Sequence, residues 1–239
     1  MNARLRRGRA RIRGGAAAML GLVGWAPSAW PAEGTSVLLK AASDYVHRGY
    51  SMADGEPTLQ GNVDFVDAGG RYLGAWVSRI HLGDARVEAS PYAGLQFTPA
   101  AGIRAEIGLA GYLYDAPVYG TDWNYAEGFA QVHYRDLLTA RVGLAVDWWG
   151  YGGLMPSFEI EAAYPLTDVI QLSGGIGYER TENLLDYDKV YWNFGANWAV
   201  HRRVTVDLRW YDSHKIGASG AAAHDDVARP ITLSVSVGF

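Results

Sequence analysis

The sequence contains no cysteine in its 239 residues. This absence excludes a disulfide scaffold, a thiolate metal site and a thiol nucleophile. It also excludes an acylated N-terminal cysteine, so the chain is not a lipoprotein.

Long apolar runs are also missing, because no segment after residue 32 approaches the roughly 18 apolar residues of a transmembrane helix. The start of the chain reads differently, with arginine-rich MNARLRRGRARIRGG, the short apolar run AAAMLGLVGWA and then PSAWPA. This order predicts a secretory signal peptide over residues 1–32, cleaved between 28 and 32. The alternative is a disordered basic tail. Residues 33–239 then form the mature domain.

Basic charge is scarce in the predicted mature chain. Removing residues 1–32 takes away six arginines and no acidic residue, which leaves 15 Lys and Arg against 25 Asp and Glu. The formal net charge moves from −4 to about −10. Nucleic-acid binding requires basic patches, so we do not expect a nucleic-acid partner.

The dominant pattern in the mature chain is an alternation of apolar and polar residues with period two. Ile231, Leu233 and Val235 alternate with Thr232 and Ser234. Such alternation predicts β-strands with two unlike faces. Marking every run predicts about twelve strands, near 35–47, 57–66, 71–80, 86–97, 102–114, 124–134, 138–148, 156–164, 169–179, 189–199, 203–212 and 229–239.

The predicted strands are longer than those of soluble proteins, which average about 5–6 residues, and fit the about 9–11 residues of a tilted membrane strand. Their connections alternate between tight turns (DAGG, TPAA, RDL, PLTD, VHRR) and longer polar stretches (GYSMADGE, HLGDAR, DAPVYGTDW, GYGGLMP, RTENLLDYD, SHKIGASGAAAHDDVA). Short periplasmic turns and longer extracellular loops are typical of outer-membrane barrels. The fold class predicted is therefore all-β, a single closed antiparallel transmembrane barrel of about twelve strands.

Charged residues populate the polar face of these strands more densely than a solvent-facing surface requires. We interpret them, together with one tryptophan, as lining the lumen: Lys40, Asp44, Arg48, Asp64, Trp76, Arg86, Glu88, Arg104, Glu106, Glu127, Arg141, Asp147, Glu159, Glu161, Glu179, Asp207 and Arg209. The other face carries aromatics, many of them near strand ends: Trp148, Tyr164, Trp192, Trp198 and Trp210. Such positions fit the aromatic girdles of a membrane barrel.

The last strand ends in Phe239. An alternating terminal strand that ends in phenylalanine looks like the assembly signal read by the outer-membrane insertion machinery. The expected partners are that machinery, the lipids of the outer membrane of a Gram-negative bacterium, and small solutes.

Four short motifs in the first part of the mature chain carry a family resemblance. They are D-Y-x-x-R-G, P-x-x-Q-G, Y-x-G-x-W-x-S and E-x-x-x-Y-A-G, matched by Asp44, Tyr45, Arg48 and Gly49; Pro57, Gln60 and Gly61; Tyr72, Gly74, Trp76 and Ser78; and Glu88, Tyr92, Ala93 and Gly94. On these residues the chain resembles the TorF porin family of proteobacteria, with a likeness that fades after about residue 135. The resemblance implies a small outer-membrane channel and transfers no catalytic residue.

The stretch SDYVHRGYS at residues 43–51 is interpreted as the end of the first strand entering an outer loop. Asp44 and Arg48 are four residues apart, so both would point into the lumen from one strand face. They either brace a narrow barrel or line a pore and bias what passes through it.

Catalytic and metal-binding alternatives find little support. Glu159 and Glu161 share a strand face, but glycosidase chemistry needs a second carboxyl group across a sugar site. The histidines lack metal-ligand spacing. Ser51, His47 and Asp54 are candidates for a hydrolytic group at the rim, but nothing in the sequence fixes their geometry. We expect no enzyme activity, no cofactor and no metal.

Three functions follow from these observations. The leading hypothesis is a porin-like channel for passive passage of small hydrophilic solutes, with a narrow lumen of weak cation preference rather than an arginine-rich track for acidic sugars. The alternatives are a closed structural or adhesive barrel without a conducting pore and, less favoured, a lipid-modifying enzyme.

Overall fold

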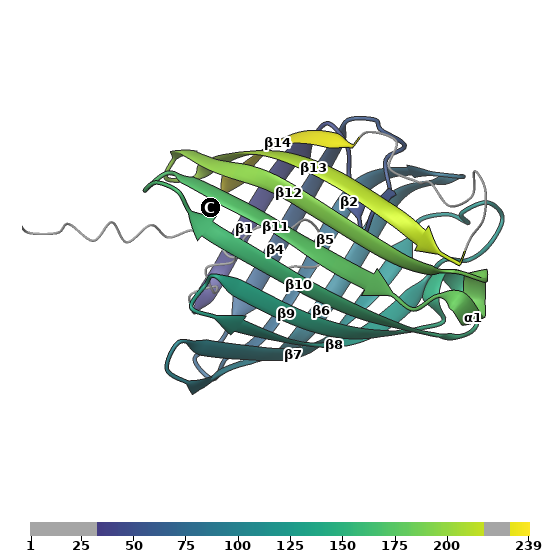
Figure 1. Cartoon of the computed structure of the whole chain (residues 1–239), viewed down its shortest axis with the longest axis horizontal. Coiled ribbons are helices and arrows are strands. Elements are labelled where there is room, and N and C mark those ends of the chain that lie inside the picture. The colour runs from purple at the N-terminus through teal and green to yellow at the C-terminus, as the bar shows by residue number, and fades with distance from the viewer. Residues whose placement is uncertain (1–32, 218–229) are drawn as a thin grey trace, which may run out of the picture.

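The computed structural model describes residues 33–217 and 230–239, and twelve long strands of this region form a closed antiparallel barrel (Figure 1). The strands are β1 (Gly34–Ala42), β4 (Thr58–Val66), β5 (Arg71–Leu82), β6 (Ala85–Ala100), β7 (Ile103–Tyr114), β8 (Tyr125–Tyr134), β9 (Leu138–Val146), β10 (Leu154–Pro165), β11 (Ile170–Glu179), β12 (Asp188–His201), β13 (Val204–Ile216) and β14 (Ile231–Gly238). The predicted closed barrel of about twelve strands is confirmed. The predicted signal peptide lies outside the described residues.

Alternation along each strand determines which side chains face the interior. In β4, Gln60, Asn62 and Asp64 are buried, whereas Leu59, Val63 and Phe65, which alternate with them, are exposed. Successive side chains of a strand point to opposite faces, so a period-two sequence yields a polar inside and an apolar outside. This arrangement is the reverse of a soluble β-protein, whose apolar face is inside.

The barrel closes where its first strand pairs with its last. Residues 38–42 of β1 pair with residues 234–238 of β14, and β1 also pairs with β4 along its whole length. The amide of Phe239 donates a hydrogen bond of 2.9 Å to the carbonyl oxygen of Val37. Phe239 therefore lies at the closing seam, with 60% of its surface exposed.

The two ends of the barrel differ in the length of their connections. At the turn end, tight turns occupy residues 67–70, 101–102, 135–137, 166–169 and 202–203. At the loop end, longer connections include 115–124, 147–153 and 180–187, which contain the short helices η1 (Trp148–Gly150) and α1 (Glu182–Leu185). The expectation of a long loop at HLGDAR was wrong, because only Gly83 and Asp84 separate β5 from β6. Most of the predicted 213–228 loop lies outside the described residues.

The first connection, residues 43–57, departs most from expectation. The predicted strand 35–47 ends at Ala42, and the chain then forms a small hairpin of β2 (Val46–His47) and β3 (Tyr50–Ser51). Residues 44–50 are all buried. The amide of His81 in β5 donates to the carbonyl oxygen of Met52, which attaches the segment to the barrel wall. We call residues 43–57 the inserted segment, because it occupies the interior of the barrel instead of extending the wall.

Within the described residues, no helix is long and apolar enough to cross a membrane.

Candidate functional site

The inserted segment presents one side chain, Arg48, at the tip of its hairpin. Arg48 and Gly49 form the two-residue turn between the paired residues His47 and Tyr50, and both have positive φ angles, 47° and 76°. Two-residue hairpin turns with two positive φ angles favour asparagine and glycine. Arginine is costly in this backbone region, by about 1–2 kcal/mol. The surroundings must therefore hold Arg48 in place.

Glutamates on the opposite wall of the barrel bind the Arg48 guanidinium. Its two terminal nitrogens donate to both oxygens of Glu127 in β8, at 2.8 and 3.1 Å. Its Nε donates to Glu159 in β10 at 3.1 Å, and Nη1 lies 3.6 Å from Glu179 in β11. Because β1 lies across the barrel from these strands, Arg48 ties the inserted segment to the far wall.

Two more cations complete this cluster. Arg141 of β9, which lies between β8 and β10, also pairs with Glu127 and donates to Glu159 at 3.2 Å. Lys189 of β12 donates to the carbonyl oxygen of Gly49 at 3.2 Å and lies over the Tyr50 ring. Removing one partner of a buried ion pair costs about 3–5 kcal/mol, because the other charge stays buried and unpaired. The cluster therefore anchors the hairpin strongly.

Apolar and aromatic side chains pack around the inserted segment toward the loop end. Trp149 stacks on Trp148 and Trp123 with ring centroids 4.4 and 4.5 Å apart, and Tyr50 meets Trp149 edge-on at 4.7 Å. Tyr45 of the segment contacts Trp76 of β5 at 5.1 Å. The core of the molecule thus sits inside the barrel, mainly toward its loop end, and extends to Val66 and Tyr72 at the turn end. Trp148, which alternation assigned to the outer face, is buried in this core because it lies past the end of β9.

His47 is packed into this core. Its ring lies 5.8 Å from that of Tyr112 and 6.4 Å from that of Tyr45. Burial, followed by the positive charge of Arg48, lowers the pKa of His47 to about 3. The imidazole is therefore neutral in the folded chain near pH 7.

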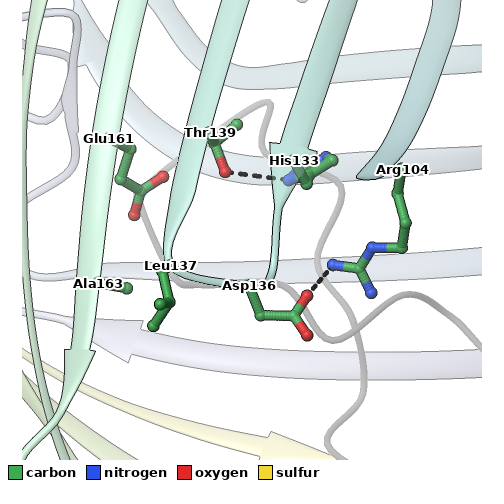
Figure 2. A pocket seen from close by; sticks show the side chains of 7 residues that line it. All are labelled: Arg104, His133, Asp136, Leu137, Thr139, Glu161 and Ala163. Carbon is green, nitrogen blue, oxygen red and sulfur yellow. Dashed lines mark hydrogen bonds and ion pairs between the residues drawn. The ribbon is translucent and has the colours of Figure 1, made fainter. Parts of the chain in front are cut away.

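The turn end of the interior is polar and more open. A pocket there is lined by Arg104, His133, Asp136, Leu137, Thr139, Glu161 and Ala163 (Figure 2). Arg104 is half-buried and pairs with the exposed Asp136 of the 135–137 turn. His133 Nδ1 and Thr139 Oγ1 share a hydrogen bond of 2.9 Å. Glu161 and Ala163 enter the pocket from one strand, β10.

Other interior charges are braced by polar neighbours on adjacent strands. Arg209 of β13 pairs with Asp207 at 3.1 Å and donates to Ser173 at 2.7 Å. The Tyr72 hydroxyl donates to Glu106 at 2.5 Å, and Gln131 donates to the other oxygen of Glu106 at 2.7 Å. These contacts satisfy buried charges that would otherwise be costly.

Most of the residues interpreted as lumen-lining lie inside the barrel. Those placed on the inner face of the wall are Lys40, Asp64, Trp76, Glu88, Arg104, Glu106, Glu127, Arg141, Glu159, Glu161, Glu179, Asp207 and Arg209. Asp44 and Arg48 are also inside, but on the inserted segment rather than on the first strand. Asp44 accepts a hydrogen bond of 2.9 Å from Ser51, whereas Arg48 crosses the interior.

Two of the proposed lumen residues are not in the interior. Arg86 is exposed, and its guanidinium donates to the carbonyl oxygens of Gly83 and Ala85, each at 2.8 Å. The β5–β6 pairing changes register there, which reverses the alternation. Asp147 is exposed because β9 ends at Val146 and Asp147 starts the next loop with a φ of 55°.

Lys189 is the interior cation that sequence reasoning missed. It lies on the same strand face as the buried Tyr191 and Asn193. Alternation alone was therefore a sufficient signal for it.

The hydrolytic alternative does not assemble in the structure. Ser51 donates to Asp44, His47 is buried among aromatic rings, and Asp54 is exposed. No group of three histidine, aspartate or glutamate side chains in residues 33–217 and 230–239 is arranged to hold a metal ion.

The twelve-stranded barrel has the architecture of outer-membrane porins. Similar solved structures include the KdgM porin in complex with disordered oligogalacturonate (TM-score 0.53, 10% identity, 85% of this chain and 98% of that chain). The NanC porin gives a TM-score of 0.52 at 6% identity over 84% and 97% of the two chains. An outer membrane channel from Pseudomonas putida F1 gives 0.51 at 10% identity over 94% and 100%. Identities this low show the fold alone.

The chain belongs to a family described as bacterial protein of unknown function (Gcw_chp), whose profile matches residues 31–238. A comparison with curated proteins found no match.

Proposed function

We propose that this protein is an outer-membrane channel for passive passage of small hydrophilic solutes, narrowed by its inserted segment. The observation that carries the proposal is the inverted distribution of side chains, with charges inside the closed barrel and exposed apolar residues outside. The resemblance to the TorF porin family and the fold shared with porins support it.

The outer surface fits lipid better than water. Leu109 is 70% exposed, Leu59 69% and Leu73 60%, and large apolar residues cover the outside of strand after strand. Continuous apolar patches of this extent are rare on soluble monomers. A closed barrel also leaves no strand edge unpaired, as hydrocarbon requires. The predicted signal peptide and the Phe239-terminated strand support export and assembly in the outer membrane of a Gram-negative bacterium.

The interior charge favours cations weakly. Interior acidic residues are Asp44, Asp64, Glu88, Glu106, Glu127, Glu159, Glu161, Glu179 and Asp207, and interior basic residues are Lys40, Arg48, Arg104, Arg141, Lys189 and Arg209. Pores lined mainly by carboxylates attract cations. The solved KdgM complex contains oligogalacturonate, an acidic sugar chain, and the excess of carboxylates here argues against a ligand of that charge.

Single-channel recording of the refolded mature chain in a planar bilayer tests the proposal. We expect discrete steps and, in a KCl gradient, a reversal potential of cation-selective sign. Glu161→Gln, which removes a charge from the more open end of the interior, should weaken the cation preference. The matched change Glu182→Gln, at an exposed position of α1, should not. Anion selectivity would contradict the proposed lumen.

A closed structural barrel is the second candidate, because the aromatic core fills the loop end of the interior. It predicts no conductance steps from a chain whose heat-modifiable migration on a gel shows that the barrel has folded.

A further inference from the structure

We propose that the Glu127, Glu159 and Glu179 cluster is a binding site for the guanidinium group of a small cationic solute, and that Arg48 occupies it as a tethered substitute. The inference deepens the proposed channel function and rests on it for the way a solute reaches the site. Release of the hairpin would uncover three carboxylates facing two remaining cations, Arg141 and Lys189.

The geometry of the Arg48 contacts is that of ligand recognition. A bidentate pair with Glu127 engages both terminal nitrogens, and Glu159 receives the remaining Nε–H at 3.1 Å. Paired carboxylates match the planar fork of a guanidinium, whereas a compact ammonium uses fewer of these contacts. The site therefore selects guanidinium over a simple amine.

The backbone supports the same reading. A β-hairpin needs only asparagine or glycine at the position of Arg48, and the positive φ of 47° is costly for arginine. Arg48 therefore does not stabilise the turn, whereas it supplies a counter-ion to the glutamates on the opposite wall. Arg48 serves the carboxylate site rather than the hairpin.

Three buried polar atoms beside the site have no hydrogen-bond partner among the described residues. They are Glu179 Oε2, Ser157 Oγ and the Tyr191 hydroxyl, each on a side chain no more than 2% exposed. A Cβ atom at Gly143 would lie 2.5 Å from Ser157 Oγ and 2.9 Å from Glu127 Oε1, so the hydroxyl adjoins the carboxylate. Tyr191 folds over Gly177, which pairs with Glu159. These atoms are hydrogen-bond acceptors that Arg48 does not use and that are available to a bound solute.

A route to the site leads from the turn end. Ser157, Glu159, Glu161 and Ala163 share the inner face of β10, and the Glu159 side chain is 14% exposed while that of Glu127 is fully buried. Glu161 and Ala163 line the polar pocket at the turn end (Figure 2). Carboxylates at successive inward positions lead a cation from this pocket to the cluster.

Rescue of a truncated variant tests the site. Arg48→Gly removes the guanidinium and relieves the costly backbone, and propylguanidinium replaces the missing atoms from Cβ outward. We expect propylguanidinium at millimolar concentration to raise the unfolding temperature of Arg48→Gly in detergent by several degrees, propylammonium to raise it less, and uncharged propylurea not at all. The double variant Arg48→Gly/Glu127→Gln should lose the response. Equal effects of propylguanidinium and propylurea would overturn the proposal.

If Arg48→Gly refolds poorly, its refolding yield is measured in place of the unfolding temperature. Propylguanidinium should then raise that yield, and propylurea should not. An unchanged yield with both compounds would equally overturn the site. The thermal readout does not depend on conduction. Absence of conductance together with rescue by propylguanidinium would contradict the proposed channel and support the proposed site. Conductance without rescue would support the channel and contradict the site.

Discussion

The two ends of the barrel interior follow different chemistry. At the loop end, Tyr45, Trp76, Trp148 and Trp149 form an apolar core around the inserted segment. At the turn end, the interior is polar, and Lys40, Arg104, Glu161 and Asp207 are partly exposed. Ions cross hydrated polar surfaces far more easily than apolar constrictions. In the proposed channel, the barrier to passage therefore lies at the loop end.

Loops supply part of this barrier, and wall strands supply the rest, including Trp76, Tyr112 and Tyr125. The inserted segment and η1 contribute Tyr45, Tyr50, Trp148 and Trp149, whereas the wall beneath them is fixed by continuous strand pairing. Loops open locally at lower free energy than core strands do. Changes at the loop end should therefore alter conductance with the wall intact, and the predictions that follow test this difference.

The largest effect is expected from Trp149→Ala. Trp149 stacks between Trp148 and Trp123 and meets Tyr50 edge-on, so its loss leaves a cavity in the aromatic core. Removing a packed tryptophan costs about 3–5 kcal/mol. We expect the temperature at which the compact gel form is lost to fall and the conductance steps to grow.

Trp198→Ala is the control for this change, because it removes the same side chain from the outer face, where Trp198 is 53% exposed. It should leave the step size unchanged. Equal conductance for both variants would show that the aromatic core does not close the loop end.

Alternation predicted the barrel wall well and its interior contents poorly. The wall strands, such as residues 231–238, have one apolar and one polar face, and this pattern specified their orientation. In residues 44–51, apolar and polar residues do not alternate between two faces, because the inserted hairpin is buried on all sides. Gly49 was the available sign of a turn, and an arginine at position 48 is not the residue that such turns favour.

Local irregularities account for the other errors. Arg86 lies beyond a register shift between β5 and β6, and alternation gives no sign of such a shift. Asp147 lies one residue past the end of its strand, within the usual uncertainty of strand ends. The cluster of Arg48 with glutamates on β8, β10 and β11 depends on contacts across the barrel, which a single sequence does not reveal.

A smaller effect is expected from acidification, through His47. Charged groups around it are Arg48 on its own hairpin, Glu127 on β8, Arg141 on β9 and Lys189 on β12. With a folded pKa of about 3 and an ordinary value near 6.5, the unfolded segment binds a proton that the folded segment does not. Stability conferred by neutral His47 is therefore complete above pH 6.5 and is lost progressively as the pH falls from 6.5 toward 3.

The loss amounts to about 1.4 kcal/mol per pH unit, or roughly 2 kcal/mol at pH 5. Conductance of the natural protein should therefore increase on acidification to pH 5. His47→Phe, which keeps a ring between Tyr45 and Tyr112, should abolish this increase, whereas His214→Gln at an exposed position should retain it. An unchanged acid response in His47→Phe would rule out His47 as its cause.

The smallest difference from a matched control is expected for Gly49→Ala, which tests whether the hairpin is packed tightly against the wall. A Cβ atom at Gly49 would lie 2.8 Å from Ser213 Cβ and 2.9 Å from Tyr191 Cβ, in a backbone with φ of 76°. Gly120→Ala is a matched control, because its φ is 82° and nothing lies within 4 Å of the added atom. Both variants pay the backbone cost of about 1 kcal/mol, and only Gly49→Ala adds about 1–2 kcal/mol of overlap.

Because that overlap acts between the hairpin and strands β12 and β13, the hairpin is the element that should yield. We expect Gly49→Ala to conduct with larger or more frequent steps than Gly120→Ala, while both migrate as folded barrels. The carbonyl oxygen of Gly49 accepts its hydrogen bond from Lys189 at 3.2 Å, so a displaced hairpin also loses this contact. Identical conductance and stability for the two variants would mean that the hairpin shifts without cost, and the barrier would then lie in the aromatic residues of the other loops.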